Sequence, residues 1–324
     1  MRNRRAQHEL GVGLGAKVDR LGRGVEHGEL ACLDGLGRRQ PAARQRDPAD
    51  FVIGGRLVAP ALACLQPHGQ IGDLDRQETL NAAFEGAHGV FLVTNFWEQA
   101  DELKQATAAI RAAKDAGVKH FIWSTLPDVE VISGGKLHVP HFTGKAKIDR
   151  MVREAGFAHH TFVIAPFYYQ GLVGALAPQK QADGSLGWAL PIDPDVRGIH
   201  MGDITELGSI VAGAFAHPDQ AGNGEYLPLV GDFMSFNEIV ETLNRQGHSF
   251  SFTRVPREVF ATFFPIAPEI AATFAWFQAH TYLGSDSSEQ IALANTIAGR
   301  APTKFATWAR VNIPVSGTVA SAVG

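Results

Sequence analysis

Residues 89–94 read Gly-Val-Phe-Leu-Val-Thr, a continuous apolar run that has the length of one β-strand. Runs of this kind are typical of strands that are buried on both faces, as in a parallel sheet covered by helices. A helical pattern follows over residues 100–116 and ends at Gly117, and a second strand-like run follows over residues 118–124. Strand, helix and strand in this order predict a βαβ unit with a right-handed crossover, and therefore an α/β fold.

The same rhythm continues to about residue 170. Residues 79–85 and 145–155 have helical spacing, and residues 161–165 form a further apolar run, so we predict a Rossmann-type parallel sheet. Beyond about residue 171 the elements change, which predicts a smaller C-terminal α+β region on the substrate side. Its aromatic residues have two open interpretations, core packing or the wall of a substrate pocket. They are Phe260, Phe263, Phe264, Phe274, Trp276, Phe277 and Tyr282.

The composition of the chain changes near residue 70. Residues 1–70 contain one aromatic residue, Phe51, out of 29 in the chain, and their basic residues are 10 Arg and 1 Lys. Such a segment can bury little apolar surface to offset its ordering entropy. Residues 51–53 form one of its few clusters of strand type. Three explanations stay open: a poorly ordered extension, a stretch read in the wrong frame or from a wrong start, and a rebuilt first unit.

The bulk composition excludes several classes of protein. With 324 residues, 45% hydrophobic, the chain can build a sizeable core, and a net charge of −4 gives no reason to expect direct binding to nucleic acid. Cys32 and Cys64 lack metal-ligand spacing, so we predict no metal site, no disulfide framework and a cytoplasmic location. No apolar run predicts a membrane span. We predict an atypical segment over residues 1–68 and one organised domain over residues 69–324.

The residues that follow the predicted strands are candidates for a binding site, because open α/β sheets bind ligands beyond the carboxyl ends of their strands. Asp73 can accept a hydrogen bond from an adenine amino group while Leu74 packs on the ring; the alternative is a turn aspartate. The other candidates at strand ends are Thr94, Asn95 and Phe96, followed by Tyr168, Tyr169, Gln170 and Gly171.

His141 and Lys145 are the candidate catalytic residues. Their spacing of four places them on one helical face if the helix begins early enough. A lysine here can donate to the nicotinamide ribose, and an imidazole can transfer a proton near neutral pH. The alternatives are a solvated lysine and a histidine satisfied by a structural partner. Lys104 either reaches back to the site or is an ordinary charge on a helix face.

Five stretches together resemble the NmrA-like family, and most closely its HSCARG-type branch of atypical short-chain dehydrogenases. The similarity covers roughly residues 69–315, and TNFWE combined with HFTGK is its most specific part. The stretches are GDLD (72–75), VFLVTNFWE (90–98), LKQ (103–105), HFTGKAKID (141–149) and the loop from Pro166 to Gly171.

The resemblance implies binding of NADP(H), with NAD as the alternative. Members of this branch are redox sensors or regulators that bind partner proteins, and relatives are NADPH-dependent reductases of quinones or phenolic compounds. By position, the resemblance implies adenine contacts from Asp73 and Leu74, pyrophosphate and ribose contacts from Thr94, Asn95 and Phe96, further cofactor contacts from Lys104 and Lys145, and closure on the nicotinamide side by Tyr168 to Gly171.

The chain departs from the family pattern in two places. The Tyr-x-x-x-Lys of ordinary short-chain dehydrogenases appears as His141-x-x-x-Lys145, which removes the usual proton donor of ketone reduction. The glycine loop that holds the pyrophosphate is absent, since Gly11–Gly15 follows no strand and has the wrong spacing. We therefore predict that the first β-α-β unit is absent or replaced. Three functions stay open: an NAD(P)(H)-binding redox sensor or regulator with little turnover, an NAD(P)H-dependent reductase of quinone-like or small aromatic substrates, and a chain that binds no dinucleotide.

Overall fold

The computed structural model describes residues 51–54, 72–98, 101–284 and 287–315. The strands are β1 (Phe51–Gly54), β2 (Gly89–Leu92), β3 (His120–Thr125), β4 (His159–Ile164), β5 (Phe167–Tyr168), β6 (Gln179–Lys180), β7 (Leu186–Leu190), β8 (Ile199–Gly202), β9 (Asn223–Pro228), β10 (Asp232–Met234) and β11 (Phe250–Arg254). The α-helices are α2 (Gln77–Phe84), α3 (Glu102–Asp115), α4 (Val129–Ile132), α5 (Pro140–Glu154), α6 (Leu207–Ala216), α7 (Pro218–Ala221), α8 (Phe236–Arg245), α9 (Arg257–Phe260), α10 (Ala267–His280), α11 (Ser288–Ala298) and α12 (Phe305–Asn312), and the 3₁₀ helices are η3 (Phe96–Glu98), η4 (Tyr169–Val173) and η5 (Ile204–Glu206).

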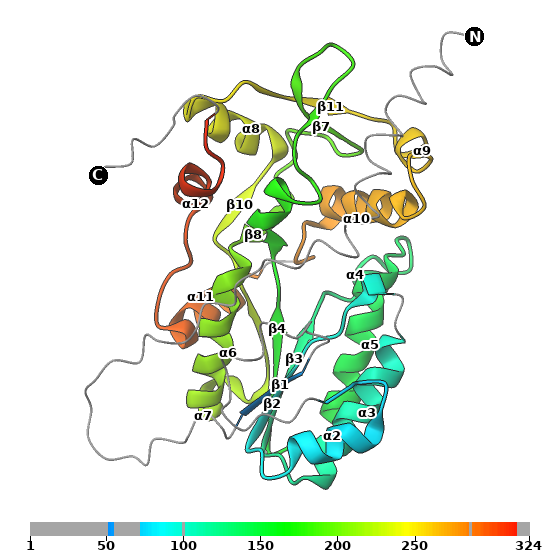
Figure 1. Cartoon of the computed structure of the whole chain (residues 1–324), viewed down its shortest axis with the longest axis vertical. Helices are drawn as coiled ribbons and strands as arrows, with labels where there is room; N and C mark the ends of the chain where they lie inside the picture. Colours follow the sequence, from blue (N-terminus) through cyan, green and yellow to red (C-terminus); the bar gives the residue numbers. More distant parts are fainter. Residues whose placement is uncertain (1–50, 55–71, 99–100, 285–286, 316–324) are drawn as a thin grey trace, which may run out of the picture.

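A parallel sheet with helices on both faces forms the centre of the molecule, as predicted. Its strand order is β1-β2-β3-β4-β9, and every neighbouring pair is parallel. Helices α2, α3 and α5 cover one face, and α6, α7 and α11 cover the other (Figure 1). The α/β fold with a Rossmann-type parallel sheet is thus confirmed for the described residues.

The apolar runs of the strands are continuous because their side chains alternate between two cores. Val90 and Leu92 of β2 join the cluster under α2, α3 and α5, whereas Phe91 joins the cluster under α6 and α11. In β3, Trp123 joins the first cluster and Ile122 the second. Successive strand residues point to opposite faces, so a strand covered on both sides must be apolar at every position.

The elements after β4 build the smaller C-terminal region. One sheet has the order β10-β8-β5 and another the order β11-β7-β6. The core here contains six of the seven aromatic residues singled out from the sequence, and Phe263 packs against it. Core packing therefore describes most of these residues, although Phe277 also lines a pocket.

Several predicted boundaries shift when tertiary structure is present. The helix predicted over residues 145–155 begins at Pro140, because proline suits the first turn of a helix. Residues 73–75 form a turn, with the Arg76 amide donating to the Asp73 carbonyl at 2.9 Å, in agreement with the turn interpretation of Asp73. Residues 51–54, which include one of the few apolar clusters of strand type before residue 70, form β1 and pair with β2.

Two predictions about the first part of the chain stay untested. The replaced first β-α-β unit falls mainly on residues 1–50 and 55–71, which lie outside the described residues. The division at residues 68 and 171 likewise stays a prediction.

His120 shows how a polar side chain is accommodated inside the sheet. Its Nε2 lies 2.8 Å from the Thr161 hydroxyl, which donates its own proton to the Ala221 carbonyl. A hydroxyl has one proton, so Nε2 must be the donor to Thr161, and the imidazole is neutral. Burial, with smaller effects from neighbouring histidines, lowers the pKa of His120 to about 3.

This buried neutral histidine makes folding sensitive to acid. The unfolded chain binds a proton at His120 below about pH 6.5 and the folded chain does not until about pH 3, so stability is lost as pH falls through this window. Between pH 7.5 and 5.5, the wild type should lose about 1.4 kcal/mol more than His120→Asn in urea unfolding. The exposed His217→Asn serves as control and should behave like the wild type. Equal losses in the wild type and His120→Asn would contradict this account.

Candidate functional site

The carboxyl ends of β2, β3 and β4 lie on the side of the sheet that faces the C-terminal region (Figure 1), and we call this row of strand ends the carboxyl edge. This edge is where open α/β sheets bind ligands. Thr94 follows β2, and Lys145 reaches it from α5. Two residues predicted from distant parts of the sequence are thus brought together at one strand end.

The ammonium group of Lys145 is held by three acceptors. It donates to the Thr94 carbonyl at 2.8 Å, to the Thr94 hydroxyl at 3.1 Å and to Glu102 Oε1 at 2.8 Å. The Thr94 hydroxyl in turn donates to Glu102 Oε1 at 2.6 Å. An ammonium group has three protons, so this arrangement uses all of them within the protein.

The surroundings of Lys145 are apolar as well as charged. Its Nζ lies 5.1 Å from the centre of the Trp123 ring, and its side chain is only 12% exposed. Burial lowers the pKa of Lys145, and the Glu102 carboxylate opposes that effect. A buried ion pair of this kind depends on both partners, since removing one leaves the other charge uncompensated.

His141 is held by an acid from the C-terminal region. Its Nδ1 lies 2.5 Å from Glu269 Oε1 in α10, and its backbone amide donates to the same oxygen at 3.1 Å. Because a carboxylate accepts, Nδ1 carries the proton. His141 and Lys145 share one helix, as expected, since α5 begins at Pro140.

Aromatic rings surround the His141 imidazole. The ring centres of Phe96, Trp97 and Phe142 lie 5.6, 5.0 and 4.7 Å from it. Trp97 is 49% exposed, so these rings form a wall that is open to solvent on one side. Asn95 supports the wall, since its Oδ1 accepts a hydrogen bond from the Trp97 amide at 3.1 Å.

The two residues predicted to contact adenine, Asp73 and Leu74, lie in a turn and in the hydrophobic core. The Asp73 carboxylate accepts from the Asp75 amide at 3.0 Å, which is the bond of an aspartate turn, and the rest of Asp73 is exposed. Leu74 is 7% exposed and packs with the residues of α2. Lys104 is exposed on α3. The cofactor contacts assigned to these residues stay predictions.

The loop predicted to close on nicotinamide divides between two environments. Tyr168 is 45% exposed, whereas Tyr169 is fully buried and donates to the Thr303 carbonyl at 3.1 Å. Gln170 donates to Asp203 Oδ1 at 2.6 Å. At Gly171, no atom lies within 4 Å of where a Cβ would be. Tyr168 and Gly171 thus border open space, while Tyr169 and Gln170 serve the C-terminal region in this structure.

Three acidic residues near these strand ends were not predicted from the sequence as site residues. Glu102 looked like an ordinary acidic residue in the first turn of a helix, and Glu269 is 128 residues from its partner. Asp149 accepts hydrogen bonds from Thr125 at 2.6 Å and Tyr226 at 2.7 Å. Burial raises its pKa to about 6 despite those bonds. Only Asp149 had a local signal, because it lies four residues after Lys145 on α5.

The described residues contain no group of three or more His, Cys, Asp or Glu side chains that could hold a metal ion. None of the helices in the described ranges is both long and apolar enough to cross a membrane.

Known proteins similar to this chain share the same architecture. An NmrA-like family domain-containing protein of Dictyostelium discoideum is 32% identical over 178 residues, which are 52% of this chain and 58% of that protein. The chain therefore spans little more than half the length of this relative.

Solved structures agree on the fold. The crystal structure of NmrA, a negative transcriptional regulator, in complex with NADP has a TM-score of 0.63 and 23% identity, covering 74% of this chain and 78% of that one. An NADPH-dependent quinone oxidoreductase of Escherichia coli complexed with NADPH has a TM-score of 0.62 and 19% identity, covering 77% and 85%.

A family model that matches most of the chain identifies the family to which it belongs. The model of the NmrA-like family matches residues 70–309, and the residues before them lie outside the match. These limits agree with the composition break near residue 70. The chain belongs to the NmrA-like family.

Proposed function

We propose that this chain binds NAD(P)(H) at the carboxyl edge of its parallel sheet and acts as a redox-responsive regulator with little turnover. The observation that carries the proposal is the engagement of both candidate catalytic side chains by acids of the chain. Lys145 donates to Thr94 and Glu102, and His141 donates to Glu269. A site built this way can bind and orient a ligand, but its proton donors are already committed.

The residues of this edge fit a nicotinamide dinucleotide in their chemistry. A ribose hydroxyl needs a donor and an acceptor, and Lys145 with Thr94 supplies both. The contact of Lys145 with the Thr94 hydroxyl is its longest, at 3.1 Å, so it is the one that a ribose would replace with least loss. When bound, the dinucleotide supplies a hydride. The part of the chain in which the family has its phosphate-binding loop lies mainly outside the described residues.

The similar proteins support both halves of the proposal. NmrA is a negative transcriptional regulator, solved in complex with NADP and also with NAD. Regulation by this chain would act through a protein partner that distinguishes the cofactor-bound from the cofactor-free form. We propose that this partner contacts Trp97, because Trp97 is exposed beside the site.

A second candidate function is the reduction of a quinone-like or small aromatic substrate. The observation that favours it is the pair of rings Phe96 and Trp97 beside His141, since Trp97 is 49% exposed and a flat ring can pack on it. Here the imidazolium form of His141 would give up its Nε2 proton while Nδ1 stays bonded to the Glu269 carboxylate, and water would return the proton. The two functions require the same cofactor and differ in the rate of substrate turnover.

Titration with NADPH and NADH, followed by tryptophan fluorescence, tests the proposal on the full chain. We expect saturable quenching, because Trp123 lies under Lys145 and Trp97 lies beside His141. With a panel of quinones, we expect turnover below about 0.1 s⁻¹, against about 10 s⁻¹ for a typical enzyme. Turnover at the typical rate would favour the reductase. Absence of saturation at millimolar concentrations of both dinucleotides would overturn cofactor binding and leave the third reading, a chain that binds none.

The role of Lys145 has its own test. Lys145→Ala should weaken NADPH binding about tenfold, the loss expected for one charge-assisted hydrogen bond. Lys147→Ala is the matched control, because Lys147 is an exposed lysine of the same helix, and its affinity should not change. Lys145→Met keeps most of the apolar stem, so it separates the loss of the ammonium group from the loss of packing. Unchanged NADPH affinity in both Lys145 variants would exclude Lys145 from the binding site.

A further inference from the structure

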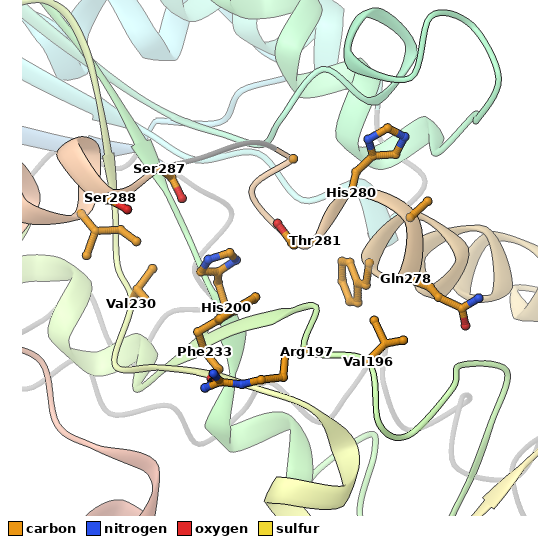
Figure 2. A pocket seen from close by; sticks show the side chains of 14 residues that line it. Val196, Arg197, His200, Val230, Phe233, Gln278, His280, Thr281, Ser287 and Ser288 are labelled. Atoms are coloured by element: carbon orange, nitrogen blue, oxygen red, sulfur yellow. Dashed lines mark hydrogen bonds between the residues drawn. The ribbon is translucent and has the colours of Figure 1, made fainter.

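A pocket in the C-terminal region lies apart from the Lys145 edge. It has a volume of about 620 Å³ and is lined by residues of β8, β10, the end of α10 and the start of α11. This volume is in the range of small-molecule sites. Figure 2 shows Arg197, His200, Phe233 and Thr281 around one space.

An aromatic layer separates this pocket from His141. Phe277 lines the pocket, and its ring centre lies 5.1 Å from that of Tyr282. Tyr282 packs on Phe142 at 5.5 Å, and Phe142 packs on His141 at 4.7 Å. A ligand in the pocket therefore does not need to contact the residues of the proposed cofactor site.

Two buried polar side chains of the pocket lack partners among the described residues. His200 is 7% exposed, and its Nδ1 makes no hydrogen bond. The hydroxyl of Thr281 is likewise buried without a partner. Such groups destabilise a fold unless something satisfies them, so each calls for a reason. A ligand that hydrogen-bonds at this wall would provide one.

The backbone at Thr281 gives independent support. Among the described residues, Thr281 is the only one other than glycine with a positive φ, at 65°. A β-branched residue rarely adopts this conformation, and strain of this kind is concentrated at functional sites. The chain keeps it here because the Thr281 amide donates to the Phe277 carbonyl at 3.0 Å and the Tyr282 amide to the Gly198 carbonyl at 2.7 Å.

The chemistry of the walls defines the ligand. His200 stacks on Phe233, with ring centres 4.3 Å apart and planes 24° apart, so each ring covers one face of the other. Burial lowers the pKa of His200 to about 4, so this stacked pair is uncharged near neutral pH. Val196, Val230 and Ile291 extend the apolar lining. A planar aromatic ring matches such walls.

Arg197 adds one positive charge at the rim. Its Nε donates to Glu238 Oε2 at 2.9 Å and its Nη2 to the Phe233 carbonyl at 2.5 Å, and its Cζ lies 5.3 Å from the centre of the Phe233 ring. These contacts fix the plane of the guanidinium, and Nη1 makes no further hydrogen bond to the described residues. None of the lining residues in the described ranges is Asp or Glu. An arginine held in this way suits a carboxylate.

We propose that this pocket is a second binding site, separate from the dinucleotide site, that takes a planar aromatic carboxylate. The ring packs among Val196, Val230, Phe233 and Ile291, the carboxylate meets Arg197, and the buried hydroxyl of Thr281 is satisfied from the ligand side. The proposal does not depend on the proposed function, because it concerns a different cavity and a different ligand.

Calorimetric titration of the full chain with 2-naphthoate tests this site, with 2-naphthylmethanol as the neutral probe of the same shape. We expect saturable binding of 2-naphthoate, about tenfold tighter than of the alcohol. Arg197→Gln should remove this preference. Prior saturation with NADPH should leave the affinity for 2-naphthoate unchanged.

A pair of matched variants places the binding in the pocket. Ala279→Phe adds a ring at an exposed position of the lining and should abolish 2-naphthoate binding, whereas Ala82→Phe on α2 makes the same exchange at an exposed site elsewhere and should leave it intact. NADPH affinity should not change in either variant, which separates this test from that of the proposed function. Equal affinity for acid and alcohol, or binding that survives Ala279→Phe, would overturn the proposal.

Discussion

The ion pair between Lys145 and Glu102 is the interaction on which the candidate site depends. It joins α5 to α3 and fixes both to Thr94 at the end of β2, through donor–acceptor distances of 2.6 to 3.1 Å. Both side chains are largely removed from water, so neither charge can be left unpaired without a large cost. The carboxyl edge of the sheet is therefore preorganised before any ligand arrives.

A second acidic residue, Glu269, holds His141 in place from the other side of the site. Glu269 belongs to α10, so its bond to His141 ties the C-terminal region to the helix that carries Lys145. Each candidate catalytic group is thus oriented by a carboxylate that the Tyr-x-x-x-Lys pattern of ordinary short-chain dehydrogenases does not include. This arrangement supports ligand binding more directly than it supports rapid proton transfer.

The sequence predicted the architecture well because burial leaves a strong local signal. The run from Gly89 to Thr94 is apolar at every strand position because β2 has a core on each face. The start of α8 also carries a local signal, because Ser235 and Glu238 form a capping box in which both bonds are present. Signals of this kind lie within a few residues, where sequence reasoning is most reliable.

The site was predictable only in part, because its key partners are distant along the chain. Thr94 and Lys145 were named from their positions, but Glu102 and Glu269 carry no local mark of the bonds they make. Asp73 and Tyr169 were named for cofactor binding, whereas the structure uses one in a turn and the other in a buried bond to Thr303. Polar residues at strand ends indicate where a site lies; the fold decides which of them face it.

A double-mutant cycle on Lys145 and Glu102 tests the central claim most directly. The free energy of unfolding in urea would be measured for the wild type, Lys145→Met, Glu102→Gln and the double variant. If the pair is a buried, mutually dependent ion pair, the coupling free energy should be about 2 kcal/mol or more, with the double variant more stable than the two single losses imply. A coupling below about 0.5 kcal/mol would contradict the account, since it would mean that the two groups behave as independent surface charges.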